Sequence, residues 1–406
     1  MTIDTLAPAP SAVPLAAISP VADWLIRKGL TRGTTASLIH GVSLRIVESG
    51  VPLWRLNFMV QTLHPQSVAA LYRWTEGEEK IWTFQPPRGE LPQYGDRFKN
   101  SPFKVVFETG IEIRRRLEGP DAVIDFPILP DLIKEGATDY IVLPVRFSDG
   151  QVNAITCTTR RAGGFTDHDI VSLRRAIRAL VGPLEVMQMR ELSRTLLDTY
   201  LGRNAGVRVL DGVIDRGAGE VIRAVIWYCD LRNFTGMSEN LPMDAMIRLL
   251  NDYFEAVGAP IQEVGGEILK FVGDAILAIF PITDGCSATE ACARALGAAT
   301  AAQGRMAALN AERAAHNWPP LGFGITLHVG DVIYGNIGTP DRLDFTVIGP
   351  AVNLVTRMED LTKELKQPVL VSDLFAELAG GDFIPMGEHR FQGIPEPRAI
   401  FAPRAG

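Results

Sequence analysis

Two aspartates stand at the ends of apolar segments that the sequence predicts to be strands. Asp230 closes "IRAVIWYCD" over residues 222–230, and Asp274 follows Gly273 inside "EILKFVGDAILAIF" over residues 267–280. Gly-Asp between apolar residues is typical of a two-residue hairpin turn. If the first strand lies beside that hairpin, both carboxylates emerge at one edge of a sheet. Two carboxylates with room for water and phosphate oxygens suit Mg²⁺, whereas either aspartate alone is equally explained as a strand cap or a turn residue.

A second Gly-Asp in the chain serves as an internal comparison. The segment "VGDVIY" over residues 329–334 nearly repeats "VGDAIL" over residues 272–277, so we predict a hairpin turn at both places. The two differ four residues before the aspartate, where one has Leu327 and the other has Lys270. A lysine inside an apolar strand either extends its ammonium to solvent or contacts a ligand. Asp274 is therefore a candidate ligand, rather than only a turn residue, when it is considered together with Lys270 and Asp230.

Polar residues in two predicted helices add to this set. The residues after Asp230, "LRNFTGMSE", predict a turn into a helix whose backbone N–H groups, together with Thr235, are able to cradle a phosphate. Asn353 and Arg357 stand four residues apart in "AVNLVTRMEDL" and therefore share one helix face. That spacing alone is also usual for a solvated face.

Three long segments together resemble the signature blocks of the class III nucleotidyl cyclases. They are "VIWYCDLRNFTGMSE", "GGEILKFVGDAILAIF" and "DFTVIGPAVNLVTRME", in this order, and the resemblance covers about residues 220–404. It implies that Asp230, Asp274 and the Leu231 carbonyl bind two Mg²⁺ or Mn²⁺ ions in each active site. One ion would lower the pKa of the ribose 3′-hydroxyl and the other would hold the triphosphate. The implied reaction is in-line attack of that oxygen on the α-phosphorus, with release of pyrophosphate.

The same resemblance implies roles for the remaining site residues. Lys270 and Thr346 fall on the two base-selecting positions, and a lysine donor with a threonine acceptor suits adenine, whereas Glu and Cys would be expected for guanine. This favours ATP as substrate and cyclic AMP as product. Asn353 would orient the ribose, and Arg357 would neutralise charge on the α-phosphate. Further substrate-binding residues are then Phe234 and Thr235.

The family builds each active site between two catalytic domains, with the metal-binding acids on one and the base-selecting and transition-state residues on the other. A chain with one such domain is therefore expected to form a head-to-tail homodimer with two equivalent sites. Two positions depart from the family pattern: Pro350, which a helix start tolerates, and Gln392, where many relatives have a Lys or Arg that contacts the triphosphate. Two alternatives stay open: a guanylyl or mixed-specificity cyclase, and a catalytically weak nucleotide-binding regulatory module.

The elements that carry these residues predict two folded parts. Residues 222–406 read as strand, helix, hairpin, helix and strand, an α+β, ferredoxin-like arrangement with additions. Before them, residues 67–74 with 79–84 and residues 140–147 with 151–159 predict two hairpins. The second is followed by "GGFTDHDI", which opens a helix with Thr166 and Asp169 at capping-box spacing. This arrangement resembles the end of a GAF domain, a small-molecule or signal-sensing module; a PAS-like α+β sensor is the alternative.

The predicted domain organisation is therefore a tail over residues 1–20, a GAF-like α+β sensory domain over 21–185, a helical and Gly-rich transducing linker over 186–221 and the cyclase domain over 222–406. The tail is an Ala/Pro-rich segment, expected to be disordered. The signal for the sensor, a small molecule or a protein, is unknown.

Composition narrows the function classes. The chain has 406 residues, a formal net charge of −7 and no Lys/Arg-rich block, which disfavours nucleic-acid binding. Its four cysteines form no CxxC pair, so neither a disulfide framework nor a thiolate zinc site is expected. No stretch reaches the ~20 apolar residues of a membrane helix. We therefore expect a cytoplasmic protein without a membrane span.

Overall fold

The computed structural model describes residues 20–28, 33–62, 67–87 and 98–404. The chain divides into two compact units, residues 1–196 and 197–406, and each is described by itself. The predicted tail over residues 1–20 lies outside the described residues except for Pro20, the first residue of a helix. The predicted domain limits at 185 and 222 remain predictions. Among the helices of the described segments, none is long and apolar enough to cross a bilayer.

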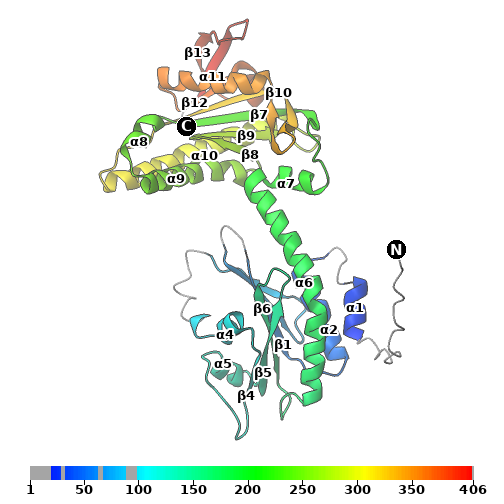
Figure 1. Ribbon diagram of the computed structural model, residues 1–406. Coiled ribbons are helices and arrows are strands. Elements are labelled where there is room, and N and C mark those ends of the chain that lie inside the picture. Colours follow the sequence, from blue (N-terminus) through cyan, green and yellow to red (C-terminus); the bar gives the residue numbers. More distant parts are fainter. Residues whose placement is uncertain (1–19, 29–32, 63–66, 88–97, 405–406) are drawn as a thin grey trace, which may run out of the picture. The chain divides into compact units, whose positions relative to one another are not determined.

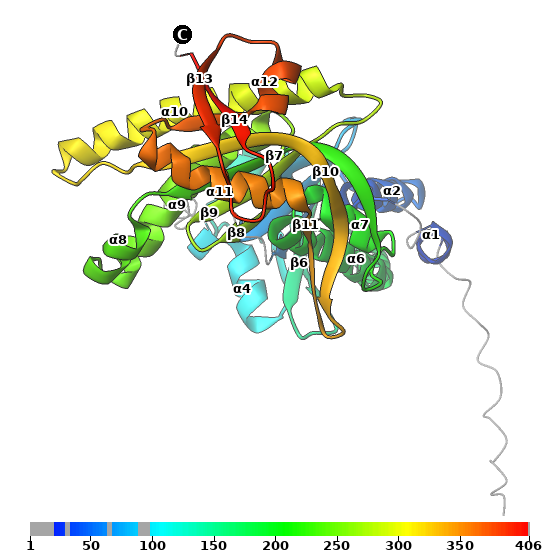
Figure 2. The same cartoon turned by 90° about the horizontal axis from the view of Figure 1, so that it is seen from above.

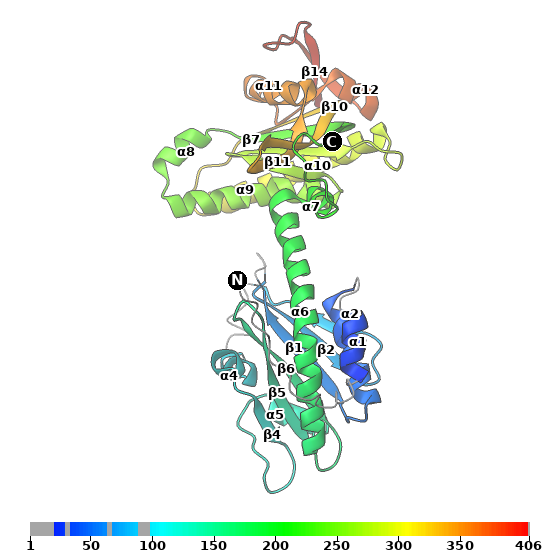
Figure 3. The same ribbon diagram turned by 45° about the vertical axis from the view of Figure 1, so that its right-hand side comes forward.

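The first unit is built on a six-stranded antiparallel sheet with the strand order β3-β2-β1-β6-β5-β4. Helices α1, α2 and α6 pack on one face of this sheet, and α4 and α5 pack on the other (Figures 1 and 3). The elements are α1 Pro20–Lys28, α2 Thr35–Glu48, β1 Arg55–Gln61, β2 Ala69–Thr75, β3 Trp82–Phe84, α4 Pro102–Thr109, β4 Ile113–Arg116, α5 Leu129–Lys134, β5 Asp139–Arg146, β6 Val152–Thr159 and α6 Asp167–Leu201.

Both hairpins predicted for this unit are present, as β2 with β3 and as β5 with β6. The helix start is also as predicted. The Thr166 backbone N–H donates to Asp169 Oδ2 at 2.7 Å, and the Asp169 N–H donates back to Thr166 Oγ1 at 3.2 Å. These reciprocal bonds satisfy donors that a helix start leaves open. The resemblance to a GAF domain remains a prediction.

The segment after α6 differs from the prediction. Residues 200–220, the Gly-rich part of the linker predicted over 186–221, contain a further helix, α7 Arg203–Leu210. Gly202, with a φ of +87°, separates α7 from α6. Ala205 of α7 is fully buried in the core of the second unit, and Asn204 donates to Glu267 Oε2 at 3.0 Å. Tertiary packing of this kind outweighs the weak helix propensity of glycine-containing segments.

The second unit is built on an eight-stranded sheet with the order β13-β14-β12-β10-β7-β9-β8, and β11 pairs with β10 beside this path. Its elements beyond α7 are β7 Gly219–Leu231, α8 Phe234–Asn240, α9 Met243–Glu263, β8 Glu267–Val272, β9 Ala275–Pro281, α10 Ala288–Ala315, β10 Phe323–Thr339, β11 Arg342–Ile348, α11 Pro350–Glu364, β12 Val369–Ser372, α12 Asp373–Ala379, β13 Phe383–His389 and β14 Arg398–Pro403.

Alternation along β7 separates the two faces of this sheet. Val225, Trp227 and Cys229 pack into a core formed with α9, α10 and α12, whereas Ala224 and Ile226 pack into the core that contains α7 and α11. Even-numbered residues of β7 therefore face α11. Asp230 belongs to this even-numbered series, so its side chain is presented on the face that α11 covers.

The prediction of a hairpin at "VGDVIY" is wrong. β10 is one continuous strand, and its Gly330 and Asp331 pair with Ala224 and Arg223 of β7 in an uninterrupted antiparallel ladder. Figure 2 shows β10 as a single long curved strand beside α11. Gly330 serves close packing rather than a turn, because a Cβ at this position would lie 2.5 Å from the Ala351 Cβ of α11. The chain reverses later, between Thr339 and Arg342.

We expect Gly330→Ala to destabilise the protein by about 1–3 kcal/mol, because the new methyl group overpacks the contact between β10 and α11. Ala351→Gly in the same chain removes the colliding methyl and should recover part of that loss, as urea unfolding would measure. The matched control is Gly297→Ala, in an exposed helical position of α10 with nothing within 4 Å of the new methyl. It should be neutral or stabilising. Equal stability of Gly330→Ala and the wild type would contradict the close packing.

Candidate active site

Asp230 and Asp274 meet at the end of β7. Cys229 pairs with Ile276 of β9, and Val272 of β8 pairs with Ala275, which leaves Gly273 and Asp274 as a two-residue loop beside Asp230. The sequence-based hairpin is therefore confirmed here. The Asp274 carboxyl lies close enough to Asp230 to raise its pKa, and the Leu231 N–H donates to Asp230 Oδ1 at 3.0 Å.

The pKa of Asp230 is raised to about 6, first by burial and then by the neighbouring Asp274 carboxyl. The Leu231 N–H and the Lys363 ammonium act in the opposite direction on this pKa. Two half-buried carboxylates in contact repel each other when both are ionised. A divalent cation removes that repulsion, so these residues fit one.

The side-chain donors at this point are two carboxylates. In the described segments, no group of three or more His, Cys, Asp or Glu side chains is placed to hold a metal ion. Mg²⁺ characteristically binds through one or two carboxylates and fills its other positions with water and substrate phosphates. A two-carboxylate set of oxygen ligands thus suits Mg²⁺ or Mn²⁺ rather than zinc.

Lys270 lies in a second group, which the sequence only partly predicted. Its ammonium forms an ion pair with Asp344 of β11, with 3.1 Å between Nζ and Oδ2. Asp344 and Thr346 are two residues apart on β11 and so share one face of that strand. Thr346 is buried, and its Oγ1 has no hydrogen-bond partner among the described residues. Asp344 was missed, although its place two residues before Thr346 was a usable signal.

Asn353 and Arg357 form a third group on α11. Asn353 is exposed and Arg357 is half-buried. The Arg357 guanidinium lies beside Gly393 in the loop between β13 and β14, about 3.6 Å from where a Cβ of that residue would be. Within the described chain Arg357 makes no ion pair, so its charge is available to a ligand. Gln392, next to Gly393, is exposed.

The predicted phosphate cradle is a short element. α8 has seven residues, and the residue before it, Asn233, has a φ of +60° without a side-chain cap. Phe234 packs partly into the core of the second unit, whereas Thr235 is exposed.

One chain thus arranges the predicted residues as three groups. These are Asp230 with Asp274, Lys270 with Asp344 near Thr346, and Asn353 with Arg357. Over the described parts of the chain, no hydrogen bond or ion pair joins one group to another. The hairpin explains the separation of the first two groups, because its strand β8 directs Lys270 toward β11 while its loop directs Asp274 toward β7.

A further set of charged residues beside Asp230 was not predicted. Glu359 of α11 is 3% exposed and forms an ion pair with Lys363, with 3.1 Å between Oε2 and Nζ. Arg232, just after β7, donates from Nη2 to the Thr362 carbonyl at 2.8 Å. The i, i+4 spacing of Glu359 and Lys363 is visible in the sequence, but its position next to β7 is not.

Comparison with known proteins bears on this region. Residues 220–378 match the family model described as the adenylate and guanylate cyclase catalytic domain. The match supports a class III cyclase catalytic domain over these residues. It contains all three groups of site residues described above.

Two curated relatives illustrate the similarity. An adenylate cyclase of Anabaena cylindrica is 39% identical over 164 residues, which are 39% of this chain and 31% of the relative. The terminal-differentiation specific adenylate cyclase of Dictyostelium discoideum is 34% identical over 156 residues, 38% of this chain and 7% of the relative. The chain thus spans less than a third of each of these relatives.

Solved structures are also similar. The adenylyl cyclase CyaB from P. aeruginosa is 26% identical with a TM-score of 0.42, and the match covers 45% of this chain and 94% of that one. The guanylyl cyclase Cya2 is 30% identical with a TM-score of 0.41, covering 45% of this chain and 92% of that one.

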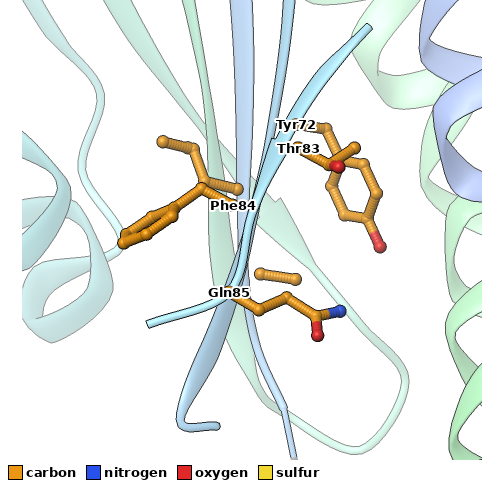
Figure 4. Close-up of a pocket in the computed structure, with 6 residues that line it drawn as sticks. Tyr72, Thr83, Phe84 and Gln85 are labelled. Carbon is orange, nitrogen blue, oxygen red and sulfur yellow. The ribbon is translucent and has the colours of Figure 1, made fainter. Parts of the chain in front are cut away.

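A pocket of about 250 Å³ lies elsewhere, in the first unit. It is lined by six residues of β2, β3 and the residue that follows β3. Figure 4 shows Tyr72 and Thr83 on one side of β3 and Phe84 on the other, so the pocket follows the edge of the sheet. The Tyr72 hydroxyl donates to Glu191 Oε2 of α6 at 3.2 Å. All of the predicted site residues lie in the second unit, away from this pocket in the sequence.

We expect Asp274→Asn to raise the melting temperature in EDTA by about 2–4 °C, because it removes a repulsion of roughly 1 kcal/mol between neighbouring carboxylates. The same substitution should abolish the further rise that Mn²⁺ produces in the wild type, since it removes a cation ligand. Differential scanning fluorimetry with and without Mn²⁺ measures both effects.

The matched control is Asp331→Asn, which changes the other Gly-Asp at an exposed position of β10. It should leave both melting temperatures unchanged. A wild-type response to Mn²⁺ in Asp274→Asn would show that the carboxylate pair is not a cation site.

Proposed function

We propose that the protein is an adenylyl cyclase, which converts ATP to 3′,5′-cyclic AMP and pyrophosphate. The observation that carries the proposal is the contact between Asp230 and Asp274, inside the region that matches the cyclase catalytic family. The two carboxylates repel each other when ionised, so their contact favours a bound cation. The same sheet also carries a polar group without a hydrogen-bond partner among the described residues, Thr346 Oγ1. The curated relatives named above as adenylate cyclases agree with this choice of substrate.

Residues of this chain supply positioning and charge. Asp230 and Asp274, with the Leu231 carbonyl, would hold two Mg²⁺ or Mn²⁺ ions. When bound, such ions lower the pKa of the attacking 3′-hydroxyl and neutralise the triphosphate. Asn353 would orient the ribose, and Arg357 would stabilise charge on the α-phosphate. Phe234 and Thr235 would contact the substrate where the chain leaves β7.

Base selection is proposed for Lys270 and Thr346. The Asp344 carboxylate holds the Lys270 ammonium, and this contact orders a long side chain at a modest cost in desolvation. The buried Thr346 Oγ1, which has no hydrogen-bond partner in the described chain, can accept a hydrogen bond from the exocyclic amine of a base. A donor and an acceptor in this arrangement suit adenine. A guanylyl or mixed-specificity cyclase is the alternative.

A head-to-tail homodimer would complete each site. Within one chain, no hydrogen bond or ion pair of the described residues joins the carboxylate pair to Lys270 or Arg357. Phe271 and Val272, which lie between Lys270 and Asp274, are 53% and 51% exposed. Exposed neighbouring apolar side chains are favourable at an interface. Two chains would then form two equivalent sites, each with acids from one chain and base-selecting residues from the other.

The first unit would be the regulator. We propose a GAF-like sensor whose signal reaches the cyclase through α6, which runs across the boundary between the units. A catalytically weak regulatory module is the second alternative, because Gln392 replaces a triphosphate-binding cation of the family. Measurement of turnover separates this alternative from the enzyme.

Full-length protein with Mn²⁺ and ATP should form cyclic AMP, and with GTP it should form much less cyclic GMP, as chromatography of the products would measure. Asp230→Ala should reduce the rate by several orders of magnitude, because phosphoryl chemistry of this kind depends on the cation. Asp331→Ala is the control and should retain the wild-type rate. A dimeric protein that forms neither cyclic nucleotide would refute the enzyme, and a preference for GTP would refute the assigned substrate.

Mixing two inactive variants tests the shared sites. Asp274→Asn removes an acid and Arg357→Ala removes a transition-state residue, so each homodimer should be inactive. After subunit exchange, half of the dimers are mixed and each has one intact site, which should restore about a quarter of the wild-type activity. Asp230→Ala mixed with Asp274→Asn is the control and should restore none. No recovery in the first mixture would argue against sites shared between chains.

A further inference from the structure

We infer that Glu359 and Lys363 form a built-in pair of opposite charges that positions Asp230 and sets its affinity for a divalent cation. Both residues belong to α11, the helix that also carries Asn353 and Arg357. The inference rests on the proposed function only in treating Asp230 as a cation ligand. Glu359 and Lys363 are positioning residues, because they act through Asp230.

The first step is the close approach of α11 to the end of β7. Asp230 pairs with Gly324 of β10, and its side chain points to the face that α11 covers. A Cβ at position 324 would lie 2.2 Å from Thr362 Oγ1 and 2.9 Å from Glu359 Oε1. Glu359 and Thr362 therefore occupy the space that a side chain would fill, directly beside Asp230. Only glycine at position 324 permits this arrangement.

The second step is the charge of Glu359. Its side chain is 3% exposed, Lys363 Nζ lies 3.1 Å from Oε2, and the Thr362 hydroxyl donates to Oε1 at 3.3 Å. A buried carboxylate without such partners would be strongly unfavourable. Lys363 is 45% exposed, and its charge acts on Asp230 as well as on Glu359. Asp230 therefore lies near both the negative charge of Glu359 and the positive charge of Lys363, and the ion pair holds these two charges together.

The third step is the connection between this pair and the backbone that follows Asp230. Arg232 Nη2 donates to the carbonyls of Thr362 at 2.8 Å and Gln367 at 3.3 Å, and the Arg232 N–H donates to the Gly322 carbonyl at 2.8 Å. The last turn of α11 is therefore tied to the residue next to Leu231. A shift of Glu359 and Lys363 would move the end of β7, and the reverse also holds.

These contacts have a consequence that a purely structural ion pair would lack. Removal of the negative charge of Glu359 leaves Lys363 unbalanced beside Asp230, which disfavours a cation. Removal of the positive charge of Lys363 leaves Glu359 unbalanced, which favours a cation. The two substitutions therefore change cation affinity in opposite directions, whereas loss of a structural contact would weaken binding in both.

The experiment titrates Mn²⁺ into nucleotide-free, full-length protein by isothermal titration calorimetry. Glu359→Gln should raise the Mn²⁺ dissociation constant about threefold or more, and Lys363→Met should lower it by a similar factor. The double variant should return close to the wild type. Lys363→Arg keeps the charge and should also bind as the wild type does.

Matched controls are Glu364→Gln and Lys366→Met, which make the same charge changes at exposed positions nearby. Both should leave the dissociation constant unchanged. Both Lys363→Met and Glu359→Gln break the ion pair of the buried Glu359 carboxylate, so the direction of the change in dissociation constant is decisive in either variant that keeps the wild-type fold. Melting temperatures report any loss of folding.

An unchanged or raised dissociation constant in Lys363→Met would overturn the inference, and so would a wild-type protein that binds no Mn²⁺ through Asp230. Opposite shifts in the two variants, in a protein that forms no cyclic nucleotide, would support the inference and refute the proposed function. The two failures are therefore distinguishable.

Discussion

The contact between Asp230 and Asp274 is the constraint around which the candidate active site of the second unit is arranged. Two acids of like charge are held together by β7, which is paired with β10 along its whole length and with β9 up to Cys229. Burial and repulsion both oppose ionisation of Asp230, and its raised pKa expresses this cost. A rigid sheet is able to bear such a cost locally, and a bound cation would remove it. Perturbed pKa values of this kind are typical of functional sites.

Helix α11 connects this constraint to the rest of the site. Its first half presents Asn353 and Arg357, and its second half packs beside Asp230 through Glu359 and Thr362. Glycines in β10 allow the helix to lie close to the sheet. In a head-to-tail dimer, one helix would then carry transition-state residues for one site while it contacts the metal-binding acid of the other.

Local patterns predicted most elements of the second unit, including the hairpin at Gly273 and a strand over residues 222–230, which the structure extends to β7 Gly219–Leu231. They failed at "VGDVIY" because a Gly-Asp pair is compatible with either a turn or a strand. The partner strand decided between these: β7 offers a continuous ladder opposite Gly330, and Ala351 of α11 occupies the space beside it. Similarly, α7 forms because Ala205 finds a core to enter, which no local signal announces.

The sequence by itself determined the types of the site residues and the elements that carry them. These follow from alternation, helical spacing and turn chemistry, which act over a few residues. Only the tertiary structure decided that Lys270 contacts Asp344, that Arg357 lies beside Gly393 and that Glu359 lies beside Asp230. The physical reason is that these neighbours are far apart in the chain. They meet only through the curvature of β10 and the docking of α11 on β10, where Gly324 and Gly330 leave room for the helix.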